Sequence, residues 1–536
     1  MTIQTNRETS VWSRKSKALA AGLLVAGMMA AFSLMPTLPA QAAPIFTVNS
    51  TADAPDAFTT SNTCDTDVFT GGDQCTLRAA IQQANATPGA DAINFNIPGT
   101  GVKTIVVNAT GLGTLPPITD QVTIDGYTQT GASPNTKAVG NDAALKIELD
   151  GTNVPDAFGL AISDSSGSVI NRFGNGIFAF GDSVRNRIQG NFIGTNPTGT
   201  LDEGNNLAGV VLLEGPSENV VGGTTPAARN IISGNGEFGV LVGASSGANL
   251  IKGNYIGTDK SGTKDLGNED AGVRVANAPA GSTIGGTTAA SRNVVSGNLN
   301  GIEVTVSQQT KVLGNRVGTT ADGKGGLGNG GDGVAVTAGF DNLIGDGTSG
   351  GSNTVAFNGD DGVEVSSISS TGNEISRNFI FSNVGLGIDL LGPGESLSAN
   401  VSTPNDPGDA DEGPNNLQND PVLSSAKTVS GKTTIQGKLD SIPNQTYTIE
   451  FHSNPQDTNE GKKFIEEKSI TTSADGLRSF AFSPATSVAV GQEITATATS
   501  TATGDTSEFS APKSVASSQK GHPVGRGLPA DHRAGA

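Results

Sequence analysis

The stretch Gly190-Asn-Phe-Ile-Gly-Thr-Asn-Pro-Thr-Gly-Thr-Leu-Asp-Glu-Gly-Asn205 decides the fold of this chain, because the chain repeats it. One copy begins at Gly253, 63 residues later, and another at Gly314, 61 residues after that. A second block, from Val221 to Asn235, returns from Ile284 to Asn298 and more loosely from Ile344 to Asn358. Two independent blocks with one period indicate a repeat architecture rather than a biased composition.

A shorter beat, a glycine followed by alternating apolar residues, runs between these blocks. Most of its steps are 29 to 33 residues, and its glycines are Gly176, Gly209, Gly239, Gly272, Gly301, Gly333, Gly362 and Gly387. Each apolar piece is short, rich in Val and Ile, and bounded by Gly, Asn or Ser, which is typical of short strands separated by turns.

One repeat unit contains six such pieces, which are Val210 to Leu213, Asn219 to Val221, Asn230 to Ser233, Val240 to Val242, Asn249 to Lys252, and Tyr255 to Gly257. Six strands in two coils give three strands per coil, so we expect an all-β chain with a right-handed parallel β-helix. A β-propeller is the alternative, but its blades need hairpin turns and usually carry aromatic residues, which are only 4% of this chain.

The recurring Gly and Asn residues have a structural role in this fold. Both tolerate left-handed backbone geometry at coil corners. Stacked Asn230, Asn293 and Asn353 are expected to hydrogen-bond their amides along the axis; contact with sugars is the alternative role. The segment from Gly190 to Asn205 and its copies predict three similar loops protruding on one flank.

The first 42 residues have the pattern of a signal peptide. Four basic residues precede an apolar stretch from Ala18 to Met35, and Ala40-Gln-Ala42 is a small-residue cleavage site. A membrane anchor is the alternative, but the apolar core is short and ends near Pro36. We therefore expect export, with cleavage near Ala42, to the extracellular space or the cell surface, and no membrane span in the mature chain.

Export makes the two cysteines interpretable. Cys64 and Cys75 are the only cysteines, with no histidine nearby, and an oxidising compartment favours a disulfide between them. A redox-active pair would require a C-x-x-C spacing.

The segment that follows carries a family resemblance. Cys75-Thr-Leu-Arg-Ala-Ala resembles the Cys-Ser-Leu-Arg-Glu-Ala motif of a family of secreted bacterial β-helix repeat proteins, with Thr76 in place of its Ser and Ala79 in place of its Glu. The resemblance covers residues 45 to 510 and implies a pectate-lyase-like β-helix displayed outside the cell. The residues themselves predict a short amphipathic helix over Leu77 to Ala84 that caps the first coil.

The composition changes after the last glycine of the beat. Four strand-like runs, from Thr433 to Leu439, Thr446 to His452, Ser479 to Ser483 and Glu493 to Thr499, suggest a small β-sandwich. We divide the chain into a signal peptide (1–42), an N-terminal cap region with the disulfide and short helix (43–100), the β-helix (101–400), an acidic linker (401–423), the β-sandwich (424–512) and a disordered tail (513–536).

The acidic linker is a candidate calcium site. Asp409, Asp411 and Asn415 are spaced so that their oxygens could surround Ca²⁺, although the order of an EF-hand is absent. A solvated acidic turn is the alternative.

The composition excludes several classes of function. There are 32 basic and 51 acidic residues, for a net charge of −19, so binding to nucleic acid or anionic lipid is not expected. His occurs three times, and only His452 precedes the tail, which excludes histidine clusters for metal chemistry.

Two sets of residues are candidates for catalysis by carboxylates or arginine. Asp360 and Asp361 form an acidic pair, but Asn358-Gly-Asp-Asp-Gly occupies the position of Asn329-Gly-Gly-Asp-Gly and so fits a coil corner as well. The outward positions of successive strands form one stripe: Val211, Leu241, Arg274, Glu303, Ala335, Glu364 and Asp389. Arg274 beside Glu303 suits a lyase, and equally an ordinary salt-bridged face.

The leading expectation is a non-catalytic, adhesin-like extracellular scaffold that contacts glycans or partner proteins. A polysaccharide lyase or glycoside hydrolase is the alternative, and a groove over Arg274, Glu303 and Glu364 would favour it.

Overall fold

The computed structural model describes residues 44–108, 111–161, 165–166, 168–181, 183–392, 394, 401–456 and 458–517. The predicted signal peptide, residues 1–42, lies outside them. No helix of these residues has both the length and the apolar character that a membrane crossing requires.

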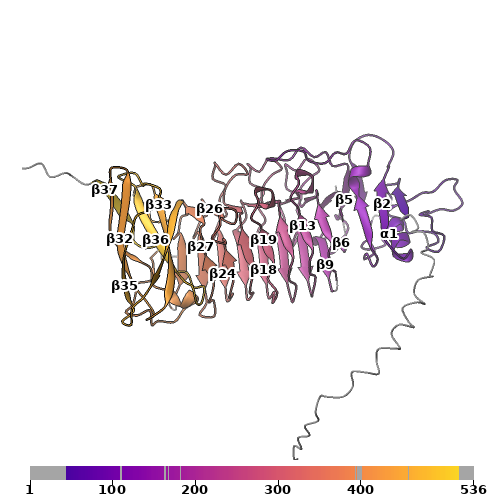
Figure 1. The fold of residues 1–536 in the computed structure, drawn as a ribbon. Coiled ribbons are helices and arrows are strands. Elements are labelled where there is room, and N and C mark those ends of the chain that lie inside the picture. Colours follow the sequence, from indigo (N-terminus) through magenta and orange to yellow (C-terminus); the bar gives the residue numbers. More distant parts are fainter. Residues whose placement is uncertain are drawn as a thin grey trace, which may run out of the picture. The chain divides into compact units, whose positions relative to one another are not determined.

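Three parallel sheets form a β-helix with three strands per coil, as the repeat predicts (Figure 1). Sheet 1 contains β1 (Ile45–Val48), β2 (Asp91–Phe95), β4 (Val122–Asp125), β7 (Ser165–Ser166), β10 (Arg187–Gln189), β13 (Val220–Gly222), β16 (Leu250–Lys252), β19 (Thr283–Gly285), β22 (Lys311–Leu313), β25 (Leu343–Ile344) and β28 (Glu374–Ile375). Sheet 2 contains β3 (Lys103–Val106), β5 (Ile147–Asp150), β8 (Ser168–Asn171), β11 (Phe192–Ile193), β14 (Ile231–Ile232), β17 (Tyr255–Ile256), β20 (Val294–Val295), β23 (Arg316–Val317), β26 (Thr354–Ala356) and β29 (Phe379–Phe381). Sheet 3 contains β6 (Phe158–Ala161), β9 (Asn175–Phe180), β12 (Val210–Leu213), β15 (Val240–Gly243), β18 (Ala271–Ala276), β21 (Asn300–Thr305), β24 (Val334–Thr337), β27 (Val363–Ser366) and β30 (Ile388–Leu391).

The core lies inside the coils, because each strand alternates an inward Val, Ile or Leu with an outward residue. In sheet 3, Val240, Val273 and Ile302 stack in register and are almost fully buried. All six strands predicted for one repeat unit are present, as β12 to β17.

Asparagine ladders run between the sheets, but with twice the density that the sequence predicts. Asn230 and Asn293 are not direct neighbours, because the repeat unit spans two coils. Asn230 Nδ2 donates to Asn254 Oδ1 at 2.9 Å, and Asn254 Nδ2 donates to Asn293 Oδ1 at 3.1 Å. The ladder continues through Asn315, Asn353 and Asn378.

A second ladder explains the glycine beat. It passes through Asn205, Asn235, Asn268, Asn298, Asn329, Asn358 and Asn383. A Cβ on Gly209 would lie 2.7 Å from Ile232 Cγ2 and 2.9 Å from Asn235 Nδ2. The beat glycines therefore leave room for the ladder, and the expectation that they provide left-handed corners is wrong for Gly209. Loop glycines do take that role, as at Gly194, where φ is 86°.

The three repeated loops lie on one flank, as predicted. Lys260 N donates to Gly199 O and Ala321 N donates to Gly262 O, both at 2.8 Å, so each loop stacks on the next.

The first coil is closed by the predicted helix, α1 (Leu77–Ala86), which packs against β1 and β2. Thr76 caps it, since its side chain accepts a hydrogen bond from Ala79 N. The disulfide between Cys64 and Cys75 lies just before it. Arg78, the arginine of the motif, is buried and forms an ion pair of 2.8 Å with Asp53, which the sequence does not reveal.

The C-terminal part is a nearly closed, mixed sheet of seven strands in the order β34-β33-β36-β37-β31-β32-β35. These are β31 (Val422–Val429), β32 (Lys432–Asp440), β33 (Thr446–Asn454), β34 (Lys463–Thr471), β35 (Leu477–Phe482), β36 (Glu493–Ser500) and β37 (Lys513–Ser517). The four predicted runs are β32, β33, β35 and β36. The prediction of a disordered tail over 513–536 is wrong for Lys513–Ser517, because these residues pair with β31 and cover its free edge. The rest of that tail lies outside the described residues.

Polar groups of this sheet and its linker cap the last coil of the β-helix. Glu450 accepts hydrogen bonds from Ser376 Oγ and Arg377 N at 2.7 Å, and Glu508 accepts from Leu390 N at 3.0 Å. Glu460 accepts from Asn383 Nδ2 and so ends the second ladder. These oxygens satisfy backbone donors that a further coil would otherwise pair.

The ladder is expected to be the element most sensitive to substitution. Asn254→Ala should lower the free energy of unfolding by about 2 kcal/mol or more, because it leaves several buried partners unpaired at about 1–3 kcal/mol each. Urea denaturation measures this. Asn206→Ala is the control, since exposed Asn206 makes one side-chain bond, to Pro155 O. If both variants lower the free energy of unfolding by the same amount, the ladder does not have this role.

Candidate functional site

The outer face of sheet 3 carries the row of side chains predicted from the beat. The strand register stacks Phe178, Val211, Leu241, Arg274, Glu303, Ala335, Glu364 and Asp389 in that order. This face changes along its length from apolar residues through Arg274 to carboxylates. The stacking of equivalent positions is what allows the sequence to predict it.

Arg274 is held in place by its neighbours. Its Nη1 lies 3.4 Å from Glu303 Oε2, and its guanidinium lies 5.2 Å from the centre of the Phe238 ring. Glu303 also accepts a hydrogen bond from Asn300 Nδ2 at 2.8 Å. The Arg274 side chain is 32% exposed, so this pair can contact a ligand at the surface while its charges are already matched.

Asp360 and Asp361 lie at a coil corner with Asp332, and oxygens of the three carboxylates lie within 4.8 Å of one another. Asp361 Oδ1 accepts a hydrogen bond from Leu386 N, and Asp361 N donates to Asp332 Oδ1 at 3.0 Å. Burial, with repulsion from Asp389, raises the pKa of Asp361 to about 8. Burial also raises the pKa of Asp332 to about 7, with repulsion from Glu364. The corner thus favours the protonated forms of Asp361 and Asp332, and burial also raises the pKa of Glu364.

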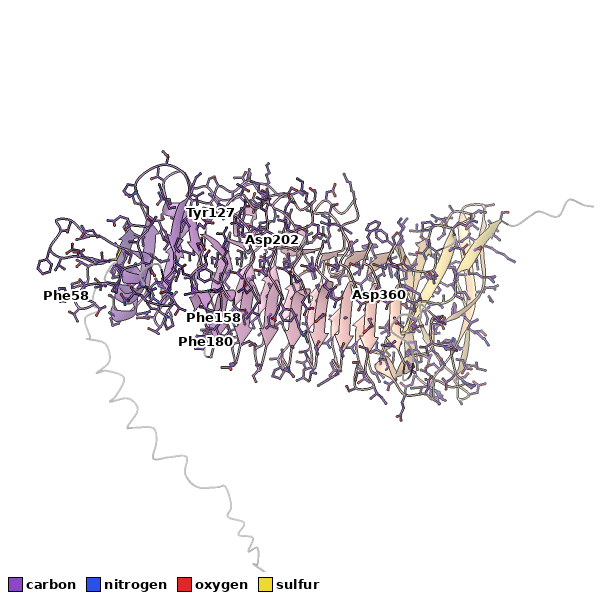
Figure 2. All side chains as sticks on the ribbon, turned by 180° about the vertical axis from the view of Figure 1, so that it is seen from behind. Phe58, Tyr127, Phe158, Phe180, Asp202 and Asp360 are labelled. Atoms are coloured by element: carbon purple, nitrogen blue, oxygen red, sulfur yellow. A yellow bond between two sulfur atoms is a disulfide. The ribbon has the colours of Figure 1, made fainter. Side chains whose placement is uncertain are left out.

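An aromatic strip occupies the N-terminal end of the same face. Phe158 and Phe178 stack with their ring centroids 4.2 Å apart and their planes 17° apart, and Phe178 and Phe180 lie 5.6 Å apart. Phe158 is 36% and Phe180 47% exposed, and both lie on one side of the molecule (Figure 2). Leu213 pairs with Phe180 on the next strand and is half-buried.

Sequence reasoning missed this strip, because its residues precede the first clear copy of the repeat. The spacing of two between Phe178 and Phe180, which places both on one face of a strand, was an available signal.

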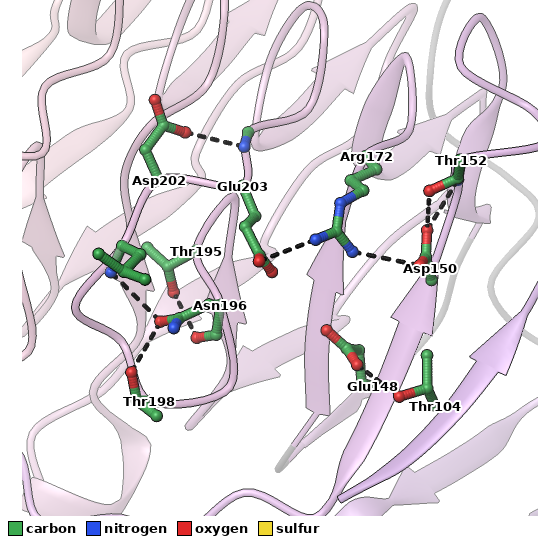
Figure 3. A network of polar contacts seen from close by, with 12 residues as sticks. Thr104, Glu148, Asp150, Thr152, Arg172, Thr195, Asn196, Thr198, Asp202 and Glu203 are labelled. Carbon is green, nitrogen blue, oxygen red and sulfur yellow. Dashed lines mark hydrogen bonds and ion pairs between the residues drawn. The ribbon is translucent and has the colours of Figure 1, made fainter.

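A second charged group lies near the start of the β-helix, where Arg172 bridges two carboxylates (Figure 3). Its distances are 3.1 Å to Asp150 and 2.8 Å to Glu203. Burial raises the pKa of Glu203, and Arg172 opposes that rise. Asp202 beside it accepts a hydrogen bond from Gly204 N at 2.9 Å. In the next copy of the loop, Asp265 accepts the equivalent hydrogen bond from Gly267 N at 2.8 Å. Asp202 therefore belongs to the turn of the repeat.

The acidic linker assembles only part of the set of residues predicted for calcium. Carboxylate oxygens of Asp406, Asp409 and Asp411 lie within 4.8 Å of one another. Asn415 is instead fully buried, accepts a hydrogen bond from Asn373 N at 3.1 Å and extends an asparagine ladder. This ladder is a third one, which runs through Asn342 and Asn373, and it engages the amide oxygen of Asn415 that the calcium prediction requires. Burial raises the pKa of Asp409 to about 6.

Comparison with known proteins adds no family. No protein-family model matches the chain, and a search of the curated proteins finds no match. The stacked parallel sheets and asparagine ladders define the class: this is a parallel β-helix repeat protein with a seven-stranded C-terminal sheet.

The raised pKa values predict that the folded protein is more stable in mild acid. A buried carboxyl whose folded pKa lies above its unfolded value binds more protons when folded, so stability falls as the pH rises from about 4 toward the folded pKa. Burial, with repulsion from Asp389, raises the pKa of Glu508 to about 9, and Asp361 follows the same rule. The Tm should therefore be higher at pH 5 than at pH 8.

Asp389→Asn removes the shared repulsion and should raise the Tm at pH 8 by about 1–2 °C, and by less at pH 5. Asp475→Asn is the control, because hydrogen bonds from Ser473 and Leu477 lower the pKa of Asp475, and its loss brings no gain at pH 8. Thermal unfolding followed by circular dichroism at both pH values checks this. A greater gain at pH 5 than at pH 8 would contradict it.

Calcium stays a prediction for the linker, now with Asp406, Asp409 and Asp411 as ligands. Calorimetric titration of CaCl₂ should show binding that Asp411→Asn weakens about tenfold or more, since the site loses one of three charges. Asp475→Asn should leave it unchanged. If titration of the parent protein with CaCl₂ releases or absorbs no heat of binding, the prediction of a calcium site is wrong.

Proposed function

We propose that this protein is an exported, non-catalytic β-helix scaffold that binds a glycan on the outer face of sheet 3. The sequence of residues 1–42, the motif from Cys75 to Ala80 and the Cys64–Cys75 disulfide support export of the kind known for secreted bacterial β-helix proteins. Display at a cell surface, as by an adhesin, is part of this proposal.

The stacked, half-exposed aromatic strip carries the proposal. An exposed apolar patch on a soluble protein marks an interaction surface. An aromatic ring presents a flat apolar face that carries partial negative charge, which suits the weakly positive C–H face of a sugar ring. Phe158 on β6 and Phe178 and Phe180 on β9 offer such rings on two neighbouring strands, and the Arg274–Glu303 pair further along the face offers groups for sugar hydroxyls.

The polar groups of the β-helix favour binding over turnover. Arg274 forms an ion pair with Glu303, and the Asp361 carboxylate accepts a hydrogen bond from the backbone of the coil corner. Two cavities of the described residues, of about 680 and 390 Å³, are lined by residues other than Arg274, Glu303 and Glu364. His452 is buried between Phe464 and Phe509, and burial lowers its pKa to about 3, so it stays neutral.

A polysaccharide lyase or glycoside hydrolase is the second candidate, and the raised pKa of Asp361 favours it, because a protonated carboxyl near neutral pH can act as a general acid. Incubation of the mature protein with a panel of polysaccharides, with and without CaCl₂, followed by assays for unsaturated products and reducing ends, separates the two. The scaffold predicts no product. Turnover that Arg274→Ala or Asp361→Asn abolishes would establish the enzyme instead.

Binding should depend on the aromatic strip. On an array of neutral and acidic oligosaccharides, Phe180→Ser should weaken binding by about two- to tenfold, the contribution of one aromatic contact, and Phe158→Ser with Phe180→Ser by more. Phe340→Ser is the matched control, because Phe340 is 40% exposed but lies outside the strip. If Phe180→Ser and the double variant both bind as the parent does, the strip is not the glycan site.

A further inference from the structure

A pocket of about 390 Å³ on the outer face of sheet 2 gathers three arginines. Arg229 and Arg292 hold the same place in two copies of the second repeated block, each after a short 3-10 turn, η2 (Pro226–Ala228) and η3 (Ala289–Ser291). Arg316 lies on β23, where the earlier copies carry Tyr255 and Phe192. The repeat thus brings the three cations together from well-separated segments of sequence.

Arg229 forms the wall of this pocket. Its guanidinium donates to Gly140 O at 2.6 Å and to Ala138 O at 2.8 Å, and it lies 4.5 Å from the centre of the Tyr255 ring. Its Nε is buried and has no hydrogen-bond partner. These contacts hold the segment before β5 against the β-helix.

Arg292 and Arg316 keep donors available. In hydrogen bonds among the described residues, the side chain of Arg292 donates only through Nε, to Gly314 O at 2.9 Å, and that of Arg316 only through Nη1, to Ala321 O. Among the described residues, neither forms an ion pair with a carboxylate, and the residues that line the pocket include no Asp or Glu. Asp322 lies near Arg316, but it is exposed and bonded to Thr320 and Lys324.

Two guanidinium groups close together in a partly desolvated pocket repel each other. Burial lowers the pKa of both Arg292 and Arg316, and Arg292 lowers that of Arg316 further. A bound anion would relieve this repulsion, and the planar donor fork of arginine matches a carboxylate or a sulfate group.

We infer that this pocket binds the anionic substituent, carboxylate or sulfate, of a short acidic oligosaccharide. The inference rests on the proposed glycan-binding function and names a second glycan-binding site, which lies on sheet 2 rather than on sheet 3. The free donors of Arg292 and Arg316 hold the anion, while Val139 and Ala289, which are exposed in the lining of the pocket, contact the apolar side of the sugar. The net charge of −19 repels long polyanions, so the fitting ligand carries few charges.

The test is calorimetric titration of the mature protein with glucuronate, glucose 6-sulfate and glucose. We expect one or both anions to bind, glucose not to bind here, and Arg292→Gln with Arg316→Gln to weaken anion binding by about tenfold or more. Arg185→Gln is the matched control, because exposed Arg185 pairs with Glu218 outside the pocket. The anion that binds distinguishes a carboxylate from a sulfate ligand.

If the double variant does not fold, as circular dichroism would show, Arg316→Lys replaces it. Lysine keeps the charge but not the fork, and anion binding should still weaken. Anion affinity equal to the parent's in a folded variant overturns the inference, as does the failure of both anions to bind the parent protein. Loss of array binding in Phe180→Ser tests the proposed function separately, so either can fail without the other.

Discussion

The asparagine ladders are the interaction on which the rest of the structure depends. Each buried amide both donates to and accepts from the coils beside it, and each also bonds backbone that the short strands leave unpaired, as Asn254 does with Val221 O. Strands of two to six residues supply few ladder bonds of their own, so the corners need this second set of hydrogen bonds. The ladders also fix the register, because an amide displaced by one residue would lose partners in the coils on both sides. The beat of glycines follows from the same constraint, since a side chain at Gly209 would occupy the space of the amide.

A stack held in this way must be closed at both ends. At the start, α1 covers the first coil, and the buried Arg78–Asp53 pair fixes the segment before it, with Arg78 also donating to Thr114 O. At the other end, Asn415 and Glu460 complete two ladders with side chains from outside the β-helix. Closing the end with carboxylates requires burying them, which raises the pKa of Glu450 to about 7 and favours its protonated form. The C-terminal sheet is therefore part of the β-helix in an energetic sense and not a separate attachment.

With the interior devoted to stacking, function is left to the outer faces. Sheet 3 presents aromatic rings, then the Arg274–Glu303 pair, then carboxylates, while sheet 2 is covered by the repeated loops and holds the arginine pocket. The two faces are chemically opposite in an otherwise acidic protein. Both proposals follow from this division, since a solenoid exposes long flat surfaces where side chains at equivalent positions accumulate.

The sequence by itself determined the β-helix, its three strands per coil and the order of the outward row from Val211 to Asp389. It could do so because stacked coils place residues of equal phase above one another, so that period alone encodes those contacts. Only the tertiary structure decided the contacts between residues that do not occupy equivalent positions in the repeat. Asn415 is hydrogen-bonded in a ladder rather than placed in a metal site, and Arg78 forms an ion pair with Asp53. Arg316 lines the same pocket as Arg292, although the two occupy different positions in the coil. Those contacts depend on where the ends of the stack and its loops lie in space, and sequence spacing carries no signal for them.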